Sequence, residues 1–321
     1  MKKVAVVCGG YSGEAVVSHR SAQMVMDNID RSRFEPVKVM IDQLAWKAEW
    51  EGVNYPIDRN DFTFTAKGVK CMFDGVFMII HGTPGEDGLL QGYFEMLGIP
   101  VTTGGVYTQA LTFNKKATTR VLSSMGFHTA RSLQLKAWEP YSSTFISQHV
   151  GLPCFVKPNC GGSSLGTSRV NHLEEMHLAL NKAFEVDDHV IIEEFISGTE
   201  VTCGVITWEG KVMALPVTEI VSKKEFFDFQ AKYEGLSEEI TPARLVPEVT
   251  ENIQRLSEDI FRKLECKGMI RVDYISRGKE IFVIEVNTTP GFSEASIIPQ
   301  QAAVQGIDKK SLITAVIQSC Y

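Results

Sequence analysis

The chain has 321 residues, of which 44% are hydrophobic, so it can bury more than one ordinary core and is expected to form two or three domains. Its formal charge is −7, from 32 basic and 39 acidic residues, and it has no long run of lysine and arginine. These values exclude the basic footprint of proteins that bind nucleic acids or anionic membranes. We therefore expect small molecules as partners.

Seven cysteines are scattered along the chain without a Cys-x-x-Cys pair, which excludes the common zinc and redox motifs and favours a reducing compartment. The apolar run after Lys2 and Lys3 is too short for a signal peptide, because Gly9 and Gly10 follow at once. No apolar run approaches the length of a membrane span. We expect a cytoplasmic protein.

Residues 3–8 are predicted to form a short buried strand, followed by the loop GGYSGE and a helix with periodic apolar residues from Val16 to Ile29. The loop is not a dinucleotide fingerprint, because Cys8 stands where GxGxxG has its first glycine. A bound NAD is therefore not expected. Glu14 lies at the helix N-terminus, where a carboxylate either stabilises the helix dipole or binds a ligand.

Two further strands are predicted at residues 36–41 and 71–80, and the second leads into the loop HGTPGEDG and a helix at 89–97. Ligands of open parallel α/β sheets bind at the carboxyl ends of the strands. Glu14 and His81 are therefore candidates for one crevice. The alternative for His81 is a structural role, which is common for a histidine in a glycine-rich loop.

A helical segment at 106–125 carries Lys115 and Lys116, and a weak strand is predicted near 132–135. A later strand ends at Lys157 and is followed by a Gly/Ser loop that returns into a β-like stretch, whereas a Walker loop runs into a helix. The amides of this loop are suited to phosphates, with Lys157 as a point charge. The alternative is an ordinary hairpin tip made of turn-forming residues.

The segment HVIIEEFI at 189–196 is predicted to be a strand. Because neighbours on a strand face opposite ways, one of Glu193 and Glu194 must point inward, where it needs a donor such as an adenine amino group. Residues 217–232 are predicted to add a strand, and the polar loop at 233–240 is long enough for a lid. Further helices are predicted at 172–186, 250–265 and 311–317.

Residues 269–275 and 280–286 read as two antiparallel strands around a turn. A two-residue Arg-Gly turn would send Asp273 and Glu285 to opposite faces, whereas a three-residue loop with Gly278 left-handed places them on one face. We prefer the longer loop. On that register one face carries three apolar and four polar residues: Ile275, Ile281 and Val283 near the turn, and Arg271, Asp273, Glu285 and Asn287 at the open end.

Two carboxylates forced together in a partly dry site repel, and a cation between them keeps both ionised. Oxygen ligands favour magnesium. The open end of the hairpin is therefore a candidate magnesium site. The alternative is an exposed hairpin with incidental charges.

The chain resembles the ATP-grasp superfamily in a set of residues taken together: Lys115, Lys157, the GGSSLG loop, Glu193 to Ile196, Glu200, Asp273, Glu285 and Asn287. Within this superfamily it is most similar to the D-alanine:D-alanine ligase family. The ordered motifs cover nearly the whole chain: GGYSGE with Ser18, HGTPGEDGLLQG, GSSLG, AKY at 231–233, RVD and EVNTTPG.

The resemblance implies a mixed α/β, three-domain ATP-grasp fold with ATP clamped between two sheets. The expected domains are an N-terminal Rossmann-like substrate domain with an open sheet at residues 1–103, a central ATP-grasp subdomain at 104–192 and a C-terminal subdomain at 193–321. The implied cofactors are ATP and two Mg²⁺ ions, for which Mn²⁺ can substitute. The implied partners are two D-alanine molecules and a second copy in a homodimer, with no nucleic acid and no membrane.

The resemblance also implies which residues hold the nucleotide and the metal. The metal ligands are Asp273, Glu285 and Asn287. The phosphate contacts are Lys115, Lys157 and Lys232. The adenosine contacts are Glu193 with the backbone of Ile196 at the adenine, Phe226 near the base, and Glu200 at the ribose.

In the family, the carboxylate of the first D-alanine attacks the γ-phosphate, and the amine of the second attacks the resulting acyl phosphate to give a dipeptide for peptidoglycan. The resemblance places Arg271 and the amide of Gly291 at the oxyanion of the tetrahedral intermediate. The remaining roles are substrate contacts: Glu14 binds the first ammonium, Ser296 binds the second carboxylate, His81 lies near the acceptor, and Glu14, Ser163 and Tyr233 form a hydrogen-bonded triad.

The sequence departs from this pattern at Phe227, where relatives often have tyrosine, and at Ala295, where some have histidine. Neither position is an implied metal ligand. Three other functions are weighed: an ATP-grasp ligase for another acid and amine, an NAD-dependent oxidoreductase, and a nucleotide-binding protein without turnover. The oxidoreductase requires a true GxGxxG, and the non-catalytic protein leaves the full metal and phosphate set unexplained.

Overall fold

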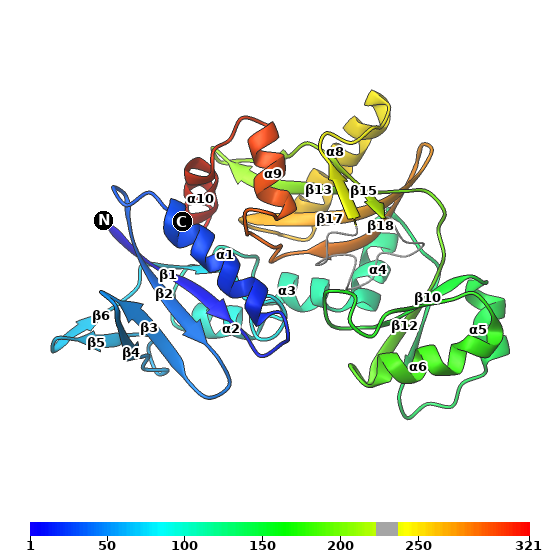
Figure 1. Ribbon diagram of the computed structural model, residues 1–321, viewed down its shortest axis with the longest axis horizontal. Helices are drawn as coiled ribbons and strands as arrows, with labels where there is room; N and C mark the ends of the chain where they lie inside the picture. The colour runs from blue at the N-terminus through cyan, green and yellow to red at the C-terminus, as the bar shows by residue number, and fades with distance from the viewer. Residues whose placement is uncertain (223–236) are drawn as a thin grey trace.

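The computed structural model describes residues 1–222 and 237–321, whose strands form three main sheets (Figure 1). The first sheet has the order β4-β3-β2-β1-β7, in which β1 is parallel to β2 and β7, and β3 and β4 extend one edge in antiparallel pairs. Its elements are β1 (Lys2–Gly9), α1 (Ala15–Asn28), β2 (Phe34–Ile41), β3 (Trp46–Trp50), β4 (Val53–Pro56), β7 (Gly75–Met78) and α2 (Leu89–Met96). This is the open Rossmann-like sheet that we expected.

The strand predicted at 71–80 is wrong at both ends. A separate small hairpin of β5 (Phe64–Ala66) and β6 (Val69–Cys71) ends where that strand was expected to begin, and β7 has four residues. β7 is buried throughout, as expected for a strand of a parallel sheet that is covered on both faces.

The second sheet is antiparallel, with the order β11-β10-β12-β9. A hydrophobic cluster joins it to α5 and α6, which cover one face. Its elements are β9 (Ser132–Lys136), α5 (Ser143–Val150), β10 (Cys154–Pro158), β11 (Ser168–Val170), the 3-10 turn Leu173–Glu175, α6 (Met176–Phe184) and β12 (His189–Glu194). α5 was not predicted from the sequence.

The third sheet has the order β16-β15-β13-β17-β18-β8, and β14 pairs with β13 beside this path. Its strands are β8 (His128–Thr129), β13 (Thr199–Trp208), β14 (Lys211–Ala214), β15 (Thr218–Ser222), β16 (Ser237–Ile240), β17 (Met269–Arg277) and β18 (Glu280–Asn287). Its helices are α3 (Val106–Phe113), α4 (Lys115–Ser124), α8 (Pro247–Lys263), α9 (Ile297–Val304) and α10 (Lys309–Gln318). The expected boundary at residue 192 falls inside β12, and the division into three domains stays a prediction.

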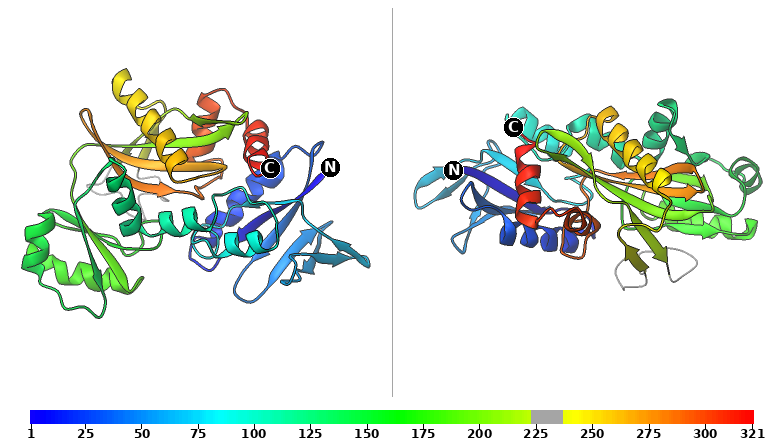
Figure 2. Two further views of the ribbon diagram at one scale, coloured as in Figure 1. Left: turned by 180° about the vertical axis from the view of Figure 1, so that it is seen from behind. Right: turned by 90° about the horizontal axis from the view of Figure 1, so that it is seen from above.

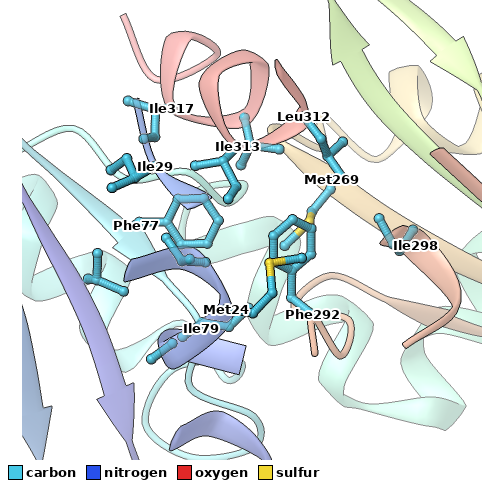
Figure 3. Packing of buried hydrophobic residues seen from close by; sticks show 14 of the residues in the cluster. Met24, Ile29, Phe77, Ile79, Met269, Phe292, Ile298, Leu312, Ile313 and Ile317 are labelled. Carbon is cyan, nitrogen blue, oxygen red and sulfur yellow. The ribbon is translucent and has the colours of Figure 1, made fainter. Parts of the chain in front are cut away.

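α8 and α10 pack in different cores. α8 covers one face of the third sheet through Ile253, Ile260 and Phe261. On the other side, α10 shares a core with α1 and with the first sheet, and both views of Figure 2 show it between the first and third sheets. Figure 3 shows this core, where Phe77 of β7 lies near Phe292, with ring centroids 5.9 Å apart. The first and third sheets are therefore joined by buried apolar contacts.

The hairpin of β17 and β18 has the predicted pairing at its open end, but a bulge in β18 produces it and not the predicted three-residue loop. Asp273 lies opposite Glu285, and Arg271 lies opposite Asn287. The three-residue loop is wrong: Arg277 pairs with Glu280 around a two-residue turn that begins at Gly278, whose φ is 64°. The register shifts between Asp273 and Tyr274, so one extra residue on β18 forms a bulge that brings the two acids onto one face.

The bulge also corrects the predicted apolar part of that face. Ile275 pairs with Phe282, whereas Ile281 and Val283 are buried in the core beneath α8. Since successive side chains alternate faces, one extra residue moves this part of β18 to the other side of the sheet. The expectation that Ile281 and Val283 share the acidic face is therefore wrong.

Several helix boundaries differ from prediction for local reasons. The helix expected over 106–125 is divided at Asn114, whose side chain caps α4 by accepting from the amide of Ala117. α8 begins with Pro247 in its first turn, three residues earlier than expected. α9 was not predicted. In the described part of the chain, no helix combines the length and apolar character needed to cross a bilayer.

Candidate active site

A cavity of about 520 Å³ lies between the second and third sheets. From the second sheet and its flap come Phe155, Lys157, Glu193 and the glycine and serine residues 161–164. From the third sheet and the segments beside it come Ile196, Glu200, Ile220, Asp273, Ile275 and Glu285. Lys115, at the start of α4, also lines the cavity. The residues expected to clamp a nucleotide are thus gathered from sequence positions far apart.

Asp273 and Glu285 form an acid pair on the cavity side of β17 and β18. The Asp273 carboxylate accepts hydrogen bonds from the hydroxyl of Thr202 at 2.6 Å and from Nδ2 of Asn287 at 3.0 Å. Residues 1–222 and 237–321 contain no group of three or more His, Cys, Asp and Glu side chains placed for a metal. The assignment of Asp273, Glu285 and Asn287 as metal ligands stays a prediction.

Both acids are also held by cationic side chains of the chain itself. Arg271 donates to both Asp273 oxygens, from Nε and from a terminal nitrogen, each at 2.8 Å. The Lys115 ammonium lies 3.0 Å from Glu285. Burial by itself lowers the pKa of Lys115, but the Glu285 carboxylate, with smaller contributions from Glu193 and Cys160, holds that pKa above its usual value. Both cations therefore stay charged within the acid pair.

Glu193 is the inward member of the Glu193–Glu194 pair, since it is 5% exposed. Its carboxylate accepts a hydrogen bond from the Lys157 ammonium at 2.6 Å. Glu194 pairs with Arg131 at the surface. The predicted need of the inward glutamate for a donor is thus met by a lysine of the neighbouring strand β10.

The glycine-rich flap at 161–166 contacts the start of α1 through Glu14. The Ser163 hydroxyl donates to a Glu14 carboxylate oxygen, so two members of the expected triad are bonded. A Cβ on Gly162 would lie 2.8 Å from both Glu14 oxygens, so the backbone of the flap lies directly against this carboxylate. Glu14 is the N-cap residue of α1, as expected, but its side chain makes no cap hydrogen bond, and the stabilisation of the helix dipole stays a prediction.

His81 is buried at the end of the first sheet, 6% exposed. Its Nδ1 lies 2.8 Å from the carbonyl of Thr289, and its Nε2 lies 3.5 Å from the hydroxyl of Ser21. Burial lowers the pKa of His81, although the nearby Glu14 acts in the other direction. The ring is therefore neutral near pH 7, and the carbonyl at Nδ1 indicates that this nitrogen carries the hydrogen.

Gly291 and Ser296 lie together at the start of α9. A Cβ on Gly291 would lie 3.1 Å from the Ser296 hydroxyl, so glycine leaves that hydroxyl accessible. The same hydroxyl accepts from the amide of Ser293 at 2.9 Å. Ser296 precedes the helix as its N-cap without a side-chain cap bond.

Four of the residues discussed above lie outside the described residues: Phe226, Phe227, Lys232 and Tyr233. Two polar residues at or near the site were not predicted: Thr202, whose hydroxyl donates to Asp273, and Glu86, which accepts from the Thr289 amide. Thr202 gave no signal, because a threonine within an apolar strand is ordinary. Glu86 stands in the HGTPGEDG motif, which was recognised without assigning this residue a role.

Family models match both parts of the chain. A model described as the N-terminus of D-ala D-ala ligase matches residues 3–104, and one described as the C-terminus matches residues 122–318. A D-alanine–D-alanine ligase of Azobacteroides pseudotrichonymphae is 46% identical, with 99% of this chain and 100% of the relative covered. One of Phocaeicola vulgatus is 44% identical, with 99% of each chain covered.

Solved structures agree in fold over the whole chain. The VanG D-Ala:D-Ser ligase of Enterococcus faecalis has a TM-score of 0.88 at 32% identity, with 100% of this chain and 99% of the other covered. A D-alanine–D-alanine ligase of Bacillus anthracis complexed with ATP has a TM-score of 0.81 at 27% identity, with 100% and 97% covered. From its sequence and its fold, the chain belongs to the D-alanine:D-alanine ligase family.

Proposed function

We propose that this chain joins two D-alanine molecules into D-alanyl-D-alanine, with ATP converted to ADP and phosphate. The observation that carries the proposal is the hydrogen bond from Ser163 to Glu14. It joins the flap of the inter-sheet cavity to the strand ends of the first sheet. A phosphate held under the flap would therefore lie next to a carboxylate suited to an amino acid's ammonium group.

The cavity supports ATP as the phosphate donor. Its apolar lining includes Ile196, Ile220 and Ile275, which suits a flat base, while Lys115 and Lys157 supply positive charge for phosphates. Glu200 lines the same cavity and is the proposed ribose ligand. Phe226 and Lys232 are proposed from the family resemblance alone.

The acid pair fits Mg²⁺, because Asp273, Glu285 and Asn287 offer only oxygen ligands and both carboxylates lie on one face. Bound there with ATP, the metal would neutralise charge on the transferred phosphoryl group. Two ions are proposed, and Mn²⁺ is the expected substitute. The sharing of Asp273 with Arg271 and of Glu285 with Lys115 is consistent with a site that is completed only when phosphates draw these cations away.

The first step is attack of a D-alanine carboxylate oxygen on the γ-phosphorus, which breaks the bond to ADP and gives an acyl phosphate. Glu14 binds the ammonium of this D-alanine and so orients its carboxylate. Lys115 and Lys157 hold the phosphates in place for transfer. The flap, bonded to Glu14, keeps water away from the acyl phosphate.

In the second step the amine of another D-alanine attacks the acyl carbon, a proton leaves the nitrogen, and phosphate departs. Ser296 binds the carboxylate of this second molecule. His81, neutral because burial lowers its pKa, is suited to accept the proton. Arg271 and the Gly291 amide stabilise the oxyanion, and Tyr233 completes the triad with Ser163 and Glu14.

Phosphate release with ATP and D-alanine tests the proposal, with L-alanine, D-lactate and D-serine as alternative substrates and mass spectrometry of the products. We expect phosphate and a dipeptide with D-alanine, and far less of either with L-alanine. Turnover that prefers another acid or amine would replace this substrate assignment while keeping the ligase chemistry. Binding of ATP without phosphate release under all conditions would refute the enzyme.

Location and assembly are proposed on separate grounds. All seven cysteines are free thiols, which is consistent with a reducing cytoplasm. A homodimer follows from the family resemblance, and light scattering after gel filtration tests it. A mass near 35.7 kDa would indicate a monomer instead.

A further inference from the structure

The segment from Thr289 to Phe292 carries the Gly291 amide and is held at both ends by residues beside the first sheet. At one end, His81 contacts the Thr289 carbonyl at 2.8 Å. At the other end, the Phe292 amide donates to the Ser21 hydroxyl at 3.1 Å. The Phe292 side chain is fully buried among residues of α1, β7 and α10 (Figure 3). The position of this segment therefore depends on contacts with the loop after β7 and with α1.

Glu86 adds a further bond to the same segment. Its Oε2 accepts from the Gly82 amide at 2.9 Å, and its Oε1 accepts from the Thr289 amide at 3.4 Å. His81 and Glu86 therefore contact the same residue, Thr289: His81 at its carbonyl and Glu86 at its amide. Two N–H groups pointing at two oxygens require a side chain that only accepts, and among the common side chains an ionised carboxylate meets this requirement at both atoms.

Burial raises the pKa of Glu86 to about 7, the nearby Glu14 and Glu285 act in the same direction, and the Gly82 and Thr289 amides lower it. The titratable and charged groups that face this region are Glu14 at the start of α1, the neutral His81 on the same loop, Arg271 on β17, and Glu285 on β18 with its partner Lys115. Glu86 therefore changes protonation within the working pH range of the proposed reaction, whereas a carboxyl in water would not.

We propose that Glu86 is a positioning residue that holds the Gly291 amide where the oxyanion of the tetrahedral intermediate forms. The inference rests on the proposed ligase function. Gly291 lies two residues after Thr289, and no Cβ restricts its backbone, so bonds to the flanking residues must supply the order that its own side chain cannot. Glu86 acts through this backbone and does not touch the reacting atoms.

The test compares Glu86→Gln and Glu86→Ala with Asp87→Asn, a control on the same loop whose carboxylate accepts from the Leu89 amide instead. The probe is a phosphinate analogue of D-alanyl-D-alanine, whose tetrahedral phosphorus imitates the intermediate. One or two lost hydrogen bonds are expected to lower kcat of Glu86→Ala by roughly 10- to 100-fold. Phosphinate affinity should fall in parallel, with KM for ATP unchanged.

Glu86→Gln keeps the shape and one acceptor, so we expect a smaller loss of kcat. In the wild type, phosphinate affinity should fall below about pH 7 as Glu86 is protonated, and in Glu86→Gln this fall should be absent. Glu14, His81 and Glu285 remain in this variant, so a pH dependence of phosphinate affinity that disappears must come from Glu86. The proposal is overturned if either variant that folds keeps wild-type phosphinate affinity, or if only KM for D-alanine rises. Failure of the wild type to ligate D-alanine would instead remove the proposed function itself.

Discussion

The ammonium of Lys115 lies 3.0 Å from the carboxylate of Glu285. Lys115 is proposed to bind phosphate and Glu285 to bind metal, so in this structure the proposed phosphate ligand neutralises the proposed metal ligand. Arg271 is bonded to Asp273 in the same way. A divalent ion that arrives alone must displace these cations, whereas an ion that arrives with ATP brings phosphates that can receive the lysine. We therefore expect metal and nucleotide to bind together.

The first prediction follows from that contact. Removing the buried positive charge in Lys115→Met should raise the affinity for Mn²⁺ without nucleotide by roughly tenfold or more, because a unit charge a few ångströms away is strongly felt in a partly dry site. Electron paramagnetic resonance of free Mn²⁺ measures this directly. The neighbouring Lys116→Met is the control, since Lys116 donates to Ser132 instead. Equal Mn²⁺ affinity in the wild type and Lys115→Met would show that Lys115 does not compete with the metal ion for Glu285.

The second prediction concerns the acid pair. Glu285→Gln removes one anionic ligand from a phosphoryl-transfer site and should lower kcat at least ~10²-fold with the fold intact. Glu280→Gln, on the same strand but in a surface pair with Arg277, should retain activity. Phosphate release and circular dichroism of both variants check the result. Near-normal turnover of Glu285→Gln would remove this residue from the metal site.

The third prediction concerns the flap. Ser163→Ala deletes the hydroxyl that donates to Glu14, so amide exchange over residues 161–166 should become faster and ligation slower. Ser164→Ala is the matched control, because Ser164 has the same left-handed backbone as Ser163, with φ of 56° and 52°. If the two variants exchange alike, the contact with Glu14 does not hold the flap.

The fourth prediction concerns pH and stability. Burial lowers the pKa of His81 in the folded chain, so below about pH 6.5, the ordinary histidine value, the unfolded chain binds the extra proton and stability falls. His81→Asn should therefore lose stability less steeply between pH 7 and pH 5 than the wild type. The pKa of Glu86 is raised, so its contribution to stability grows as the pH falls, opposite to that of His81. The difference in stability between the wild type and His81→Asn is therefore the quantity to measure, because Glu86 is present in both.

Urea unfolding across the pH series measures this slope, and His149→Asn on α5 serves as the control. Identical slopes for the wild type and His81→Asn would show that His81 is not held neutral by the fold.

The fifth prediction concerns the acceptor and uses a residue outside the described part of the chain. If Tyr233 favours attack by an amine, Tyr233→Phe should lose most dipeptide synthesis and gain in relative depsipeptide yield with D-lactate. The loss of a hydroxyl partner corresponds to roughly one to two decades in rate. Mass spectrometry of products from mixed D-alanine and D-lactate gives the ratio, and an unchanged ratio would exclude Tyr233 from specificity.

The acid pair shows how far the sequence alone could be read. Alternation along β17 and β18 predicted that Asp273 and Glu285 share a face, provided that the register was right. One extra residue is needed for this register, and it can lie either in the turn or as a bulge within a strand. Both positions give the same pairing at the open end. Sequence periodicity does not distinguish a loop from a bulge, so Ile281 and Val283 were assigned to the wrong face.

Glu86 shows a different reason for a missed residue. Local patterns predicted that the HGTPGEDG loop follows a strand, and this is confirmed. The partner of Glu86 is Thr289, which lies 203 residues later in the chain. Burial by a distant segment changes the chemistry of a carboxyl without any local signal, so its role required the three-dimensional structure.

The shared core of β1, α1 and α10 has a consequence for how the chain folds as it is synthesised. Val4 and Val6 are synthesised long before Ile313 and Val316, which pack in the same cluster. Domains usually fold in order from the N-terminus during translation. Here the strands of the first sheet are synthesised before α10, so one apolar face of that sheet stays exposed until the second and third sheets and α10 have also been made.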